Sequence, residues 1–351
     1  MSAGQGNNGP ITPNVKREAH ELAGTLQVKS GLPEDWLPVA SFDVMRKRAQ
    51  LLAQIRSFMQ ARDILEVDTP VLDSAANPDP AIDSLTSIVR FPDAVTGRTC
   101  YLHTSPEFAM KRLLAAGSGP IYQICKVFRD HECGRLHQPE FTLLEWYRPG
   151  FDHHELMDEI GALLVALQFK PPDKTPYADA FLHTTGLDPH GAGLTELSNR
   201  AAGLGLDSGG GDRSLLLDLI FSHQVAPHLG TAGPQFIYDY PVCQAAMARI
   251  RNGQPAVAER FELFINGIEI ANGFNELCDI SEQYSRFMKD NERRRIRGQP
   301  ELPVDRRLLA ALAHGLPSCA GVALGLDRLL LVLTRSRYLA DVLSYPLCSG
   351  G

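Results

Sequence analysis

Long apolar runs are missing from this sequence. Its longest, such as LLLVL at 329–333, are short, whereas a membrane-spanning helix needs roughly 18 apolar residues. The first 25 residues also contain no apolar stretch of the signal-peptide type. The sequence therefore predicts no membrane-spanning segment and a cytoplasmic location.

The cysteines are few, and their spacing is irregular. The chain has seven, an odd number, with no C-x-x-C pair among them. Such a pattern predicts neither a disulfide framework nor a structural zinc site. His131, Cys133 and His137 stand close together in the sequence, but without a fourth ligand nearby they do not indicate zinc.

An excess of basic residues is also absent. The 34 Lys and Arg are outnumbered by 41 Asp and Glu, which gives a net charge of −7. This balance argues against a protein that binds nucleic acid mainly through phosphate contacts. With 44% apolar and 21% charged residues over 351 positions, the chain has the composition of a globular enzyme of one large or two average domains.

Common catalytic motifs are missing as well. The sequence contains no G-x-x-x-x-G-K-[ST] phosphate-binding loop, no G-x-S-x-G nucleophile elbow and no H-E-x-x-H metal pair. Any nucleotide chemistry must therefore use other residues.

The chain divides into a short tail and one long catalytic domain. Residues 1–40 are rich in Gly, Asn, Pro and Ser and show neither helical nor strand periodicity, so we expect a flexible N-terminal tail. The domain, 41–351, begins with an amphipathic helix whose apolar residues recur at steps of three and four. The residues of this apolar face are Leu51, Leu52, Ile55, Phe58 and Met59.

Strands joined by hairpins follow the first helix. The segments 121–130 and 141–148 have strand character, and the polar stretch 131–140 between them contains Gly134 and Pro139, which predicts a hairpin loop. Further strands alternate with long helical insertions rather than in regular βαβ units. We therefore expect an α+β fold, with a mainly antiparallel sheet flanked by helices.

The hairpin holds the densest group of candidate ligands for a nucleotide. Arg129 follows an apolar strand, and its planar, permanently charged guanidinium suits phosphate oxygens. Phe141 begins the returning strand and offers a ring on which a purine could stack, while His137 in the loop could donate to phosphate. Alone, these residues are more typical of a surface hairpin with a salt-bridged arginine and a core phenylalanine.

Two further groups complete the candidates. In GVALGLDR at 321–328, glycines precede Arg328 at the start of an apolar helix, where an arginine can meet phosphate. The alternative is a tight turn with Arg328 paired to Asp327 or a neighbouring acid. Glu262 and Glu269 lie seven residues apart, and their hard oxygens suit Mg²⁺, although an isolated pair of acids is as often simply solvated.

Taken together, these segments resemble the catalytic core of the class II aminoacyl-tRNA synthetases. LEVDTP is similar to motif 1, FRDHECGRLHQPEF to motif 2 and GVALGLDR to motif 3, in that order along the chain. TSPEFAMKRLL and FELFINGIEIANGFNE resemble the lysine-type synthetases, and the match runs from about residue 40 to 348. The resemblance implies a homodimer, with Pro70 and the helix before it as the dimer element.

The resemblance is closer still to the truncated paralogues of that subgroup, the elongation factor P–(R)-β-lysine ligases. Residues 1–40 have no strand pattern, whereas an anticodon-binding OB barrel needs five strands. LEWYRP and GVALG have the form found in the ligases, and Ala323 stands where the synthetases generally have Gly. One methyl group against a substrate changes binding by about 1–3 kcal/mol, enough to reshape the preference between α- and β-amino isomers.

The resemblance also implies roles for individual residues at the nucleotide. Arg129 would bind the α-phosphate of ATP, Phe141 would stack on adenine, and His137 would reach the outer phosphates. Arg328 would pair with the γ-phosphate, so Arg129 and Arg328 are the expected catalytic residues.

The resemblance assigns Glu262 and Glu269 to Mg²⁺ and includes one departure in motif 2. The usual Arg-x-Glu has His131 at its third position here, with Glu132 after it, and Gln138 replaces the usual Asn. Either Glu132 takes the place of the usual glutamate after a small shift of the loop, or the contact that this glutamate makes with adenine or with the acceptor is weakened.

The amino-acid pocket implied by the resemblance has eight residues. They are Ser105, Glu107, Glu145, Tyr147, Asn272, Phe274, Glu276 and Ala323. Glu145 and Glu276 would be counter-charges for an ammonium tail, and Phe274 would pack against its methylene groups. A buried lysine-like cation requires such acids, because burying it unpaired would cost several kcal/mol.

The expected reaction is activation of (R)-β-lysine by ATP as an acyl-adenylate and its transfer to a lysine of elongation factor P; tRNA is not an expected partner. One alternative is a minimal lysyl-tRNA synthetase-like enzyme that activates α-lysine for tRNA or another carrier. Another is a catalytically silent paralogue that serves as a regulatory binding module. The basic stretch 286–307, with Arg293, Arg294 and Arg295, could dock an acidic partner, although such a stretch is more often a solvated helix face.

Overall fold

The computed structural model describes residues 36–90, 92, 96–206 and 211–348. The predicted tail, 1–40, lies outside these residues except at its end. There, the backbone N–H groups of Val39 and Ala40 donate to the carbonyls of Ser344 and Leu343, at 2.9 and 3.1 Å. The compact unit that begins at Val39 therefore starts beside residues near the C-terminus.

A nine-stranded sheet runs through the described part of the chain. Its strands are β1 (Leu65–Glu66), β5 (Ile121–Phe128), β6 (Glu140–Pro149), β7 (Asp173–Pro176), β8 (Gln235–Pro241), β9 (Ile250–Arg251), β10 (Val257–Ile265), β11 (Ile268–Asn275) and β12 (Cys319–Gly325). They lie in the order β1-β5-β6-β12-β11-β10-β8-β7, with β9 paired to β10. The pairs β1–β5 and β7–β8 are parallel and the other described pairs antiparallel, which confirms the predicted α+β fold.

Two hairpins form the centre of this sheet. β5 and β6 pair along their whole length, which confirms the loop predicted at 131–140. β10 and β11 are joined by Asn266 and Gly267, both with positive φ, 52° and 73°. Such a two-residue turn matches the twist of the strands that it connects, and the register that it sets between β10 and β11 shifts once, between Leu263 and Phe264.

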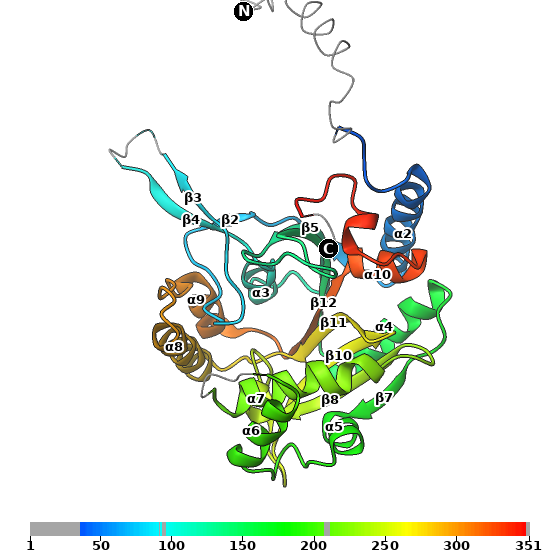
Figure 1. The fold of residues 1–351 in the computed structure, drawn as a ribbon. Helices are drawn as coiled ribbons and strands as arrows, with labels where there is room; N and C mark the ends of the chain where they lie inside the picture. The colour runs from blue at the N-terminus through cyan, green and yellow to red at the C-terminus, as the bar shows by residue number, and fades with distance from the viewer. Residues whose placement is uncertain (1–35, 91, 93–95, 207–210, 349–351) are drawn as a thin grey trace, which may run out of the picture. The chain divides into compact units, whose positions relative to one another are not determined.

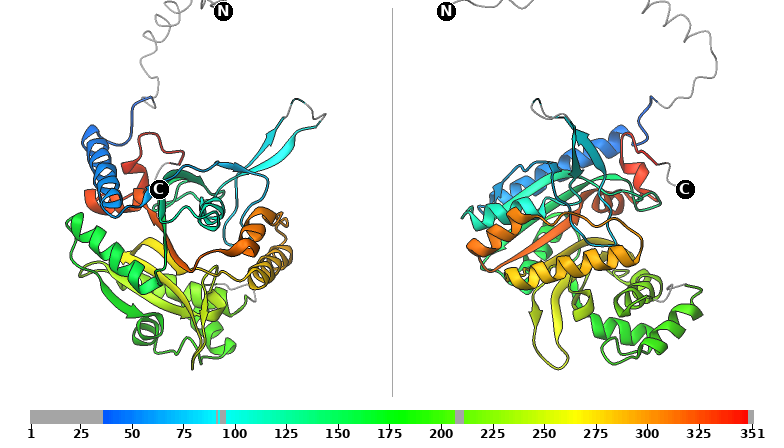
Figure 2. Two further views of the ribbon diagram at one scale, coloured as in Figure 1. Left: turned by 180° about the vertical axis from the view of Figure 1, so that it is seen from behind. Right: turned by 90° about the vertical axis from the view of Figure 1, so that its left-hand side faces the viewer.

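A second, smaller sheet contains β2 (Leu72–Asp73), β3 (Thr86–Val89) and β4 (Arg98–Leu102), in the order β2-β4-β3. Figure 1 shows β3 and β4 projecting as an arm from the rest of the chain, and the view from behind in Figure 2 shows the same arm. The arm is thus separate from the main sheet.

Helices pack on the main sheet and on one another. They are α2 (Phe42–Gln60), α3 (Glu107–Ala115), α4 (His153–Ala166), α5 (Tyr177–Thr185), α6 (Leu194–Gly203), α7 (Arg213–Ile220), α8 (Ile280–Ile296), α9 (Arg306–Gly315) and α10 (Leu326–Thr334). α4 and α10 contact strands of the main sheet, and α2 lies beside α10 (Figure 1). None of the described helices has the length and apolar character needed to cross a membrane.

α2 confirms the first predicted helix. Its predicted apolar face is buried, apart from Leu52, which is half-buried. The hydroxyl oxygen of Ser41 accepts a hydrogen bond from Val44 N at 3.3 Å and so caps the first turn.

The two faces of β6 show how one sheet holds both a core and a polar site. Successive side chains of a strand point to opposite faces. Leu144 and Trp146 are fully buried in the main apolar core, which also contains residues of α2, α4 and α10. Glu145 and Tyr147, which alternate with them, therefore lie on the other face.

Candidate functional site

A cleft of about 390 Å³ opens on that other face. Nine of the site residues predicted from the sequence line it, namely Ser105, Glu107, Arg129, Glu145, Tyr147, Asn272, Phe274, Glu276 and Ala323. The remaining five contact these residues, Arg260 or one another, namely His137, Phe141, Glu262, Glu269 and Arg328. The structure thus brings the predicted residues together, while their roles stay predictions.

Four adjacent strands, β6, β12, β11 and β10, present much of the site in two rows of register partners. The first row is Glu145, Ala323, Asn272 and Glu262, and the second is Tyr147, Gly321, Phe274 and Arg260. Because residues two apart on a strand share a face, both rows lie on the same side of the sheet. The sheet order, rather than proximity in sequence, therefore assembles the site.

Gly321 makes room for two of these side chains. A Cβ atom at this position would lie 2.3 Å from Tyr147 Cε1 and 2.4 Å from Glu276 Oε1. Only a residue without a side chain lets the ring and the carboxylate approach the strand this closely. The glycine of GVALG at 321 therefore shapes the wall of the cleft.

Glu145 is buried at the centre of the cleft wall. Ser105 Oγ and Tyr147 Oη each donate a hydrogen bond to its carboxyl group, both at 2.8 Å. Burial, and then the charge of Glu107, raise the pKa of Glu145 to about 8. Its carboxyl group therefore keeps a proton near neutral pH unless a cation binds beside it.

Lys111, one turn after Glu107 on α3, is the cation already present among these acids. Its side chain is 1% exposed, and Nζ lies 2.7 Å from Glu107 Oε1 and 2.6 Å from Glu276 Oε2. Burial alone would lower the pKa of Lys111, but the charges of Glu107 and Glu276 outweigh it and raise the pKa well above its usual range. Burial raises the pKa of Glu276 to about 7, against the opposing effect of Lys111.

We call Glu107, Lys111, Glu145 and Glu276 the acid pocket. Three carboxyl groups face one ammonium group, so full ionisation leaves two negative charges without a partner among these four residues. Buried charges of this kind are costly unless they are paired. The acid pocket is therefore suited to a ligand that supplies positive charge.

Arg129 stands after β5, where the hairpin loop begins. Its guanidinium lies 5.0 Å from the centre of the Phe141 ring, a cation–π contact. Glu132 lies 3.6 Å away, and Arg129 Nε is buried without a hydrogen-bond partner. A buried donor without an acceptor is unfavourable, so an anion that accepts from Nε would be stabilised here.

Arg328, in the first turn of α10, reaches the same loop. Its Nη1 donates to Glu269 O at 3.0 Å, and its Nη2 lies 2.9 Å from His137 Nε2. Burial, then the charge of Arg328 and, more weakly, that of Arg129, lower the pKa of His137. The neutral ring accepts from Arg328 through Nε2, which leaves Nδ1 as its donor. We call Arg129, His137, Phe141 and Arg328 the arginine half of the site.

Glu262 and Glu269 lie on the paired strands β10 and β11. Arg260, which lines the cleft, donates to Glu262 and also to Asn272 Oδ1, the latter at 3.2 Å. Burial, and in addition the charge of Glu269, raise the pKa of Glu262 to about 7 despite the opposing effect of Arg260. The negative charge of Glu262 and Glu269 is therefore not fully balanced. Their carboxylate oxygens are hard ligands, which suit a divalent cation such as Mg²⁺.

Comparison with known proteins agrees with this geometry. The family of tRNA synthetases class II (D, K and N) matches residues 39–349. The chain belongs to the class II tRNA synthetases. The elongation factor P–(R)-β-lysine ligase of Vibrio cholerae is 47% identical over 316 residues, which are 89% of this chain and 98% of that protein. The ligase of the same name from Pectobacterium carotovorum is 46% identical over 314 residues, 88% and 97% of the two chains.

The motif 2 loop of this class II synthetase accommodates the departure at His131. His131 has a positive φ of 62°, and its side chain is exposed to solvent. Glu132, the next residue, has its carboxylate 3.6 Å from Arg129 Nη1. Glu132 thus lies beside Arg129, and both alternatives for the missing acid stay predictions.

Sequence reasoning missed two residues of the synthetase site, Lys111 and Arg260. Both were detectable by spacing. Lys111 lies four residues after Glu107, the distance at which helical side chains meet, and Arg260 lies two residues before Glu262, on the same face of a strand. Each neutralises part of a cluster of acids, so both change the charge that a ligand meets.

The basic stretch 286–307 is only partly the solvated surface that docking requires. Arg294 is buried, and its guanidinium contacts Asp83 at 2.7 Å and the carbonyl of Pro300 at 2.8 Å. The docking hypothesis is wrong for Arg294, because a charge run read from sequence does not show which members point inward. Arg293 pairs with Asp212 and is partly exposed.

The spacing of the cysteines predicts no disulfide framework, and it gives no sign of the one disulfide found among the described residues. Cys133 in the motif 2 loop is bonded to Cys348, 215 residues later, with Cα atoms 6.0 Å apart. Gln138 joins the same two segments, because its side chain donates to Cys348 O at 2.8 Å and accepts from Cys348 N at 3.0 Å. No local spacing signals a bond between segments this far apart in sequence.

Proposed function

We propose that this chain is an ATP-dependent ligase that activates (R)-β-lysine as an acyl-adenylate and transfers it to a lysine side chain of elongation factor P. The observation that carries the proposal is the excess of carboxyl groups in the acid pocket. The relatives that cover nearly all of this chain carry the name of that ligase, and β-lysine brings two ammonium groups, the charge that the acid pocket accepts.

The cleft would also orient this substrate. Its ammonium groups would lie at the acid pocket, where they offset the charge of Glu145 and Glu276. Its carboxylate would lie toward Arg129, a cation that lines the same cleft. Phe274 and the ring of Tyr147, on the second row of the sheet, would pack against the methylene groups between the two ends.

In the first half-reaction a carboxylate oxygen of β-lysine would attack the α-phosphorus of ATP. The new C–O–P link of the acyl-adenylate forms as the bond to pyrophosphate breaks, and no general base is needed because the carboxylate is already ionised. Arg129 and Arg328 would stabilise the charge on the phosphates, while His137 would donate from Nδ1. Glu262 and Glu269 would hold Mg²⁺, which when bound neutralises phosphate charge.

In the second half-reaction the amine of a lysine on elongation factor P would attack the activated carbonyl carbon. The amide bond forms, the bond to AMP breaks, and the attacking nitrogen loses a proton. Water must be excluded from the adenylate until this amine arrives, and a largely buried acid pocket favours that.

A homodimer in the cytoplasm completes the proposal. Phe42 on α2 is 68% exposed and Leu65 on β1 is 56% exposed, and both belong to the region similar to motif 1. Single exposed apolar side chains are common on protein surfaces, so the resemblance to motif 1 supports the dimer and these two residues are candidates for its contact. Light scattering on the purified protein should give twice the chain mass, and the mass of a single chain would remove this part of the proposal.

The experiment for the proposed reaction has two stages. Purified protein with ATP and (R)-β-lysine should incorporate labelled pyrophosphate into ATP, with α-lysine much weaker. Intact-mass measurement of elongation factor P after incubation should show the gain of one lysyl group. Equal or greater exchange with α-lysine would reject the substrate, charging of tRNA would favour a lysyl-tRNA synthetase-like enzyme, and no exchange at all would favour a silent binding paralogue.

A further inference from the structure

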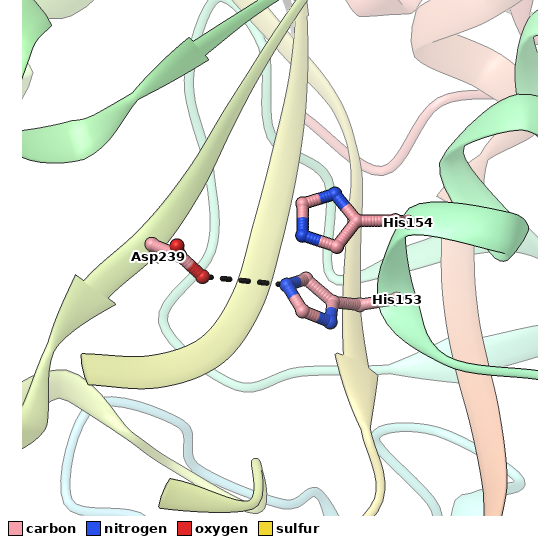
Figure 3. Close-up of side chains that lie close together, drawn as sticks. All are labelled: His153, His154 and Asp239. Carbon is pink, nitrogen blue, oxygen red and sulfur yellow. Dashed lines mark hydrogen bonds and ion pairs between the residues drawn. The ribbon is translucent and has the colours of Figure 1, made fainter. Parts of the chain in front are cut away.

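A second group of metal-ligating side chains lies outside the cleft. His153 and His154 begin α4, and Asp239 lies on β8 (Figure 3). One ligand atom from each lies within 4.8 Å of the others, and His153 Nε2 is 3.3 Å from Asp239 Oδ1. We propose that these three residues bind one Zn²⁺ or similar transition-metal ion, at a site separate from the catalytic cleft.

The two histidines are held in place by the start of the helix. Asp152 caps α4, and its carboxylate accepts from the backbone N–H groups of His154 and Glu155, at 2.8 and 2.9 Å. The imidazole rings of His153 and His154 lie 4.1 Å apart, and Tyr238 packs edge-on against His154 at 5.2 Å. Adjacent residues therefore turn their rings toward one side of the helix, the side on which Asp239 lies (Figure 3).

His153 is a buried histidine with one polar partner. It is 1% exposed, and its Nε2 faces the carboxylate of Asp239 at 3.3 Å. A neutral imidazole can offer this nitrogen to a metal ion in place of the single hydrogen bond.

The backbone conformation of Asp239 and its contact with Arg251 also position its carboxylate for a metal ion. Its φ is 59°, in the left-handed region that residues other than glycine adopt at some cost, and such residues gather at functional positions. Arg251 donates to the second carboxylate oxygen and so leaves the first for His153 or for a metal. A residue that orients a ligating carboxylate in this way is a usual companion of metal sites.

The donor set selects the kind of ion. Two imidazole nitrogens and one carboxylate oxygen suit Zn²⁺ and its neighbours, whereas Mg²⁺ and Ca²⁺ prefer oxygen ligands alone. With metal–ligand distances of about 2.0–2.2 Å in a tetrahedron, ligand atoms lie roughly 3.3 Å apart, as those of His153 and Asp239 already do. His154 is partly exposed, so it can move the remaining distance and leave one position to water. The ion would join α4 to β8.

The test compares cluster variants with a histidine outside the cluster. His154→Ala and Asp239→Asn remove one ligand each, and His190→Ala is the control, because His190 is also half-buried but lies elsewhere. Zn²⁺ titrations by calorimetry, with excess Mg²⁺ to occupy oxygen sites, should give one ion per chain for the unchanged protein and the control. The two cluster variants should bind at least about tenfold more weakly.

Two further readouts keep the result interpretable. Co²⁺ bound in place of Zn²⁺ should show no sulfur-to-metal charge-transfer absorption, because thiolates are not ligands at this site. Zn²⁺ should raise the melting temperature of the unchanged protein and of His190→Ala but not of His154→Ala, with pyrophosphate exchange unaltered in all three. Equal Zn²⁺ affinity in His154→Ala and the unchanged protein, or a thiolate spectrum, would overturn the proposal.

Discussion

The two halves of the cleft differ in how firmly the protein holds them. In the acid pocket, Lys111 and Glu276 have side chains that are 1% exposed and join at 2.6 Å. In the arginine half, the side chains of Arg129 and Arg328 are 25% and 22% exposed, and their acidic partners lie at 3.6 and 3.5 Å. The acid pocket is a preformed counter-charge, whereas the ion pairs of the two arginines are longer and more exposed, although Arg328 also has hydrogen bonds to Glu269 O and His137.

This difference matches the two kinds of ligand. A ligase must distinguish its amino-acid substrate from other amino acids of similar size and charge. Rigid, buried groups discriminate more strongly between such substrates than exposed ones do. A triphosphate is recognised mainly by charge, and arginines that remain near solvent can reach it without breaking a buried network. Substitutions in the two halves should therefore have different consequences, the first mainly on stability and selectivity, the second on rate.

Lys111→Met should have the largest effect. It leaves Glu107 and Glu276 buried without their cation, and breaking a buried pair by removing one partner costs about 3–5 kcal/mol. Urea unfolding should show this loss in the free energy of unfolding. Lys47→Met is the matched control, since Lys47 pairs with Asp43 at the same helical spacing but in solvent, and should change the free energy by less than about 1 kcal/mol. Similar losses in both would contradict the contrast between the halves.

Arg129→Ala should lower the rate of ATP–pyrophosphate exchange rather than the free energy of unfolding. In the proposed reaction the substitution would remove a charge that faces the phosphates, and losing one such donor typically lowers a rate by about 10²–10³-fold. ATP–pyrophosphate exchange measures this, and the free energy of unfolding should change little, because the guanidinium is partly exposed and loosely paired. Arg295→Ala, which removes an exposed arginine paired to Glu292, should leave exchange unchanged. A stability loss as large as that of Lys111→Met would erase the distinction.

The pKa of Glu145 predicts how substrate binding depends on pH. With this pKa raised to about 8, the carboxyl of the empty pocket is protonated at pH 7, and an ammonium group must displace that proton. The affinity for (R)-β-lysine should therefore rise between about pH 6 and 8 and then level off, by at most about tenfold per pH unit. Calorimetry at pH 7 in two buffers of different ionisation enthalpy should detect the released protons, and Glu145→Gln should reduce their number to the contribution of Glu276, whose pKa is about 7.

The raised pKa of Glu145 also affects the stability of the protein, and the variant Glu145→Gln can test this effect. A carboxyl group whose pKa in the folded protein lies above its unfolded value stabilises the fold at low pH. This stabilisation is lost as the pH rises toward the folded pKa of about 8. The empty protein should thus become less stable between about pH 5 and 8, and Glu145→Gln should show a flatter profile over that range.

Ala323→Gly should have the smallest effect. Ala323 lies between Glu145 and Asn272 in the first row of the sheet and lines the cleft, so its methyl group would border the proposed substrate. Removing one methyl group should change the preference between α- and β-lysine by roughly tenfold, the low end for a single methylene-sized change. The ratio of pyrophosphate exchange with the two isomers measures this preference, with Ala320→Gly as a control on the same strand. An unchanged ratio would place the origin of selectivity elsewhere.

Much of the fold could be predicted from the sequence, because local patterns specify it. The apolar steps of α2, the alternation along β5 and β6 and the polar loop between them all depend on neighbouring residues. The first row of the site does not depend on residues that are close in sequence. Glu145, Ala323 and Asn272 become neighbours only through the order of β6, β12 and β11. Those residues were predicted through the family resemblance rather than through periodicity.

The errors have a common physical cause, which is that charge and thiol patterns do not reveal burial or long-range pairing. Arg294 belongs to a run of basic residues and yet points inward. Cys133 pairs not with Cys125, which is near it in the sequence, but with Cys348, 215 residues later. In both cases the tertiary fold decides the environment of a side chain that the sequence alone presents as ordinary.

The attachment of the motif 2 loop to Cys348 has two parts with different chemistry. In a reducing compartment the bond between Cys133 and Cys348 would open, but the amide of Gln138 would still grip both backbone groups of Cys348. The motif 2 loop would then stay attached to Cys348 in oxidising and reducing surroundings alike. Gln138 thereby holds the loop in place whether or not the disulfide is formed. Asparagine is one methylene group shorter, so its amide would lie farther from the backbone of Cys348.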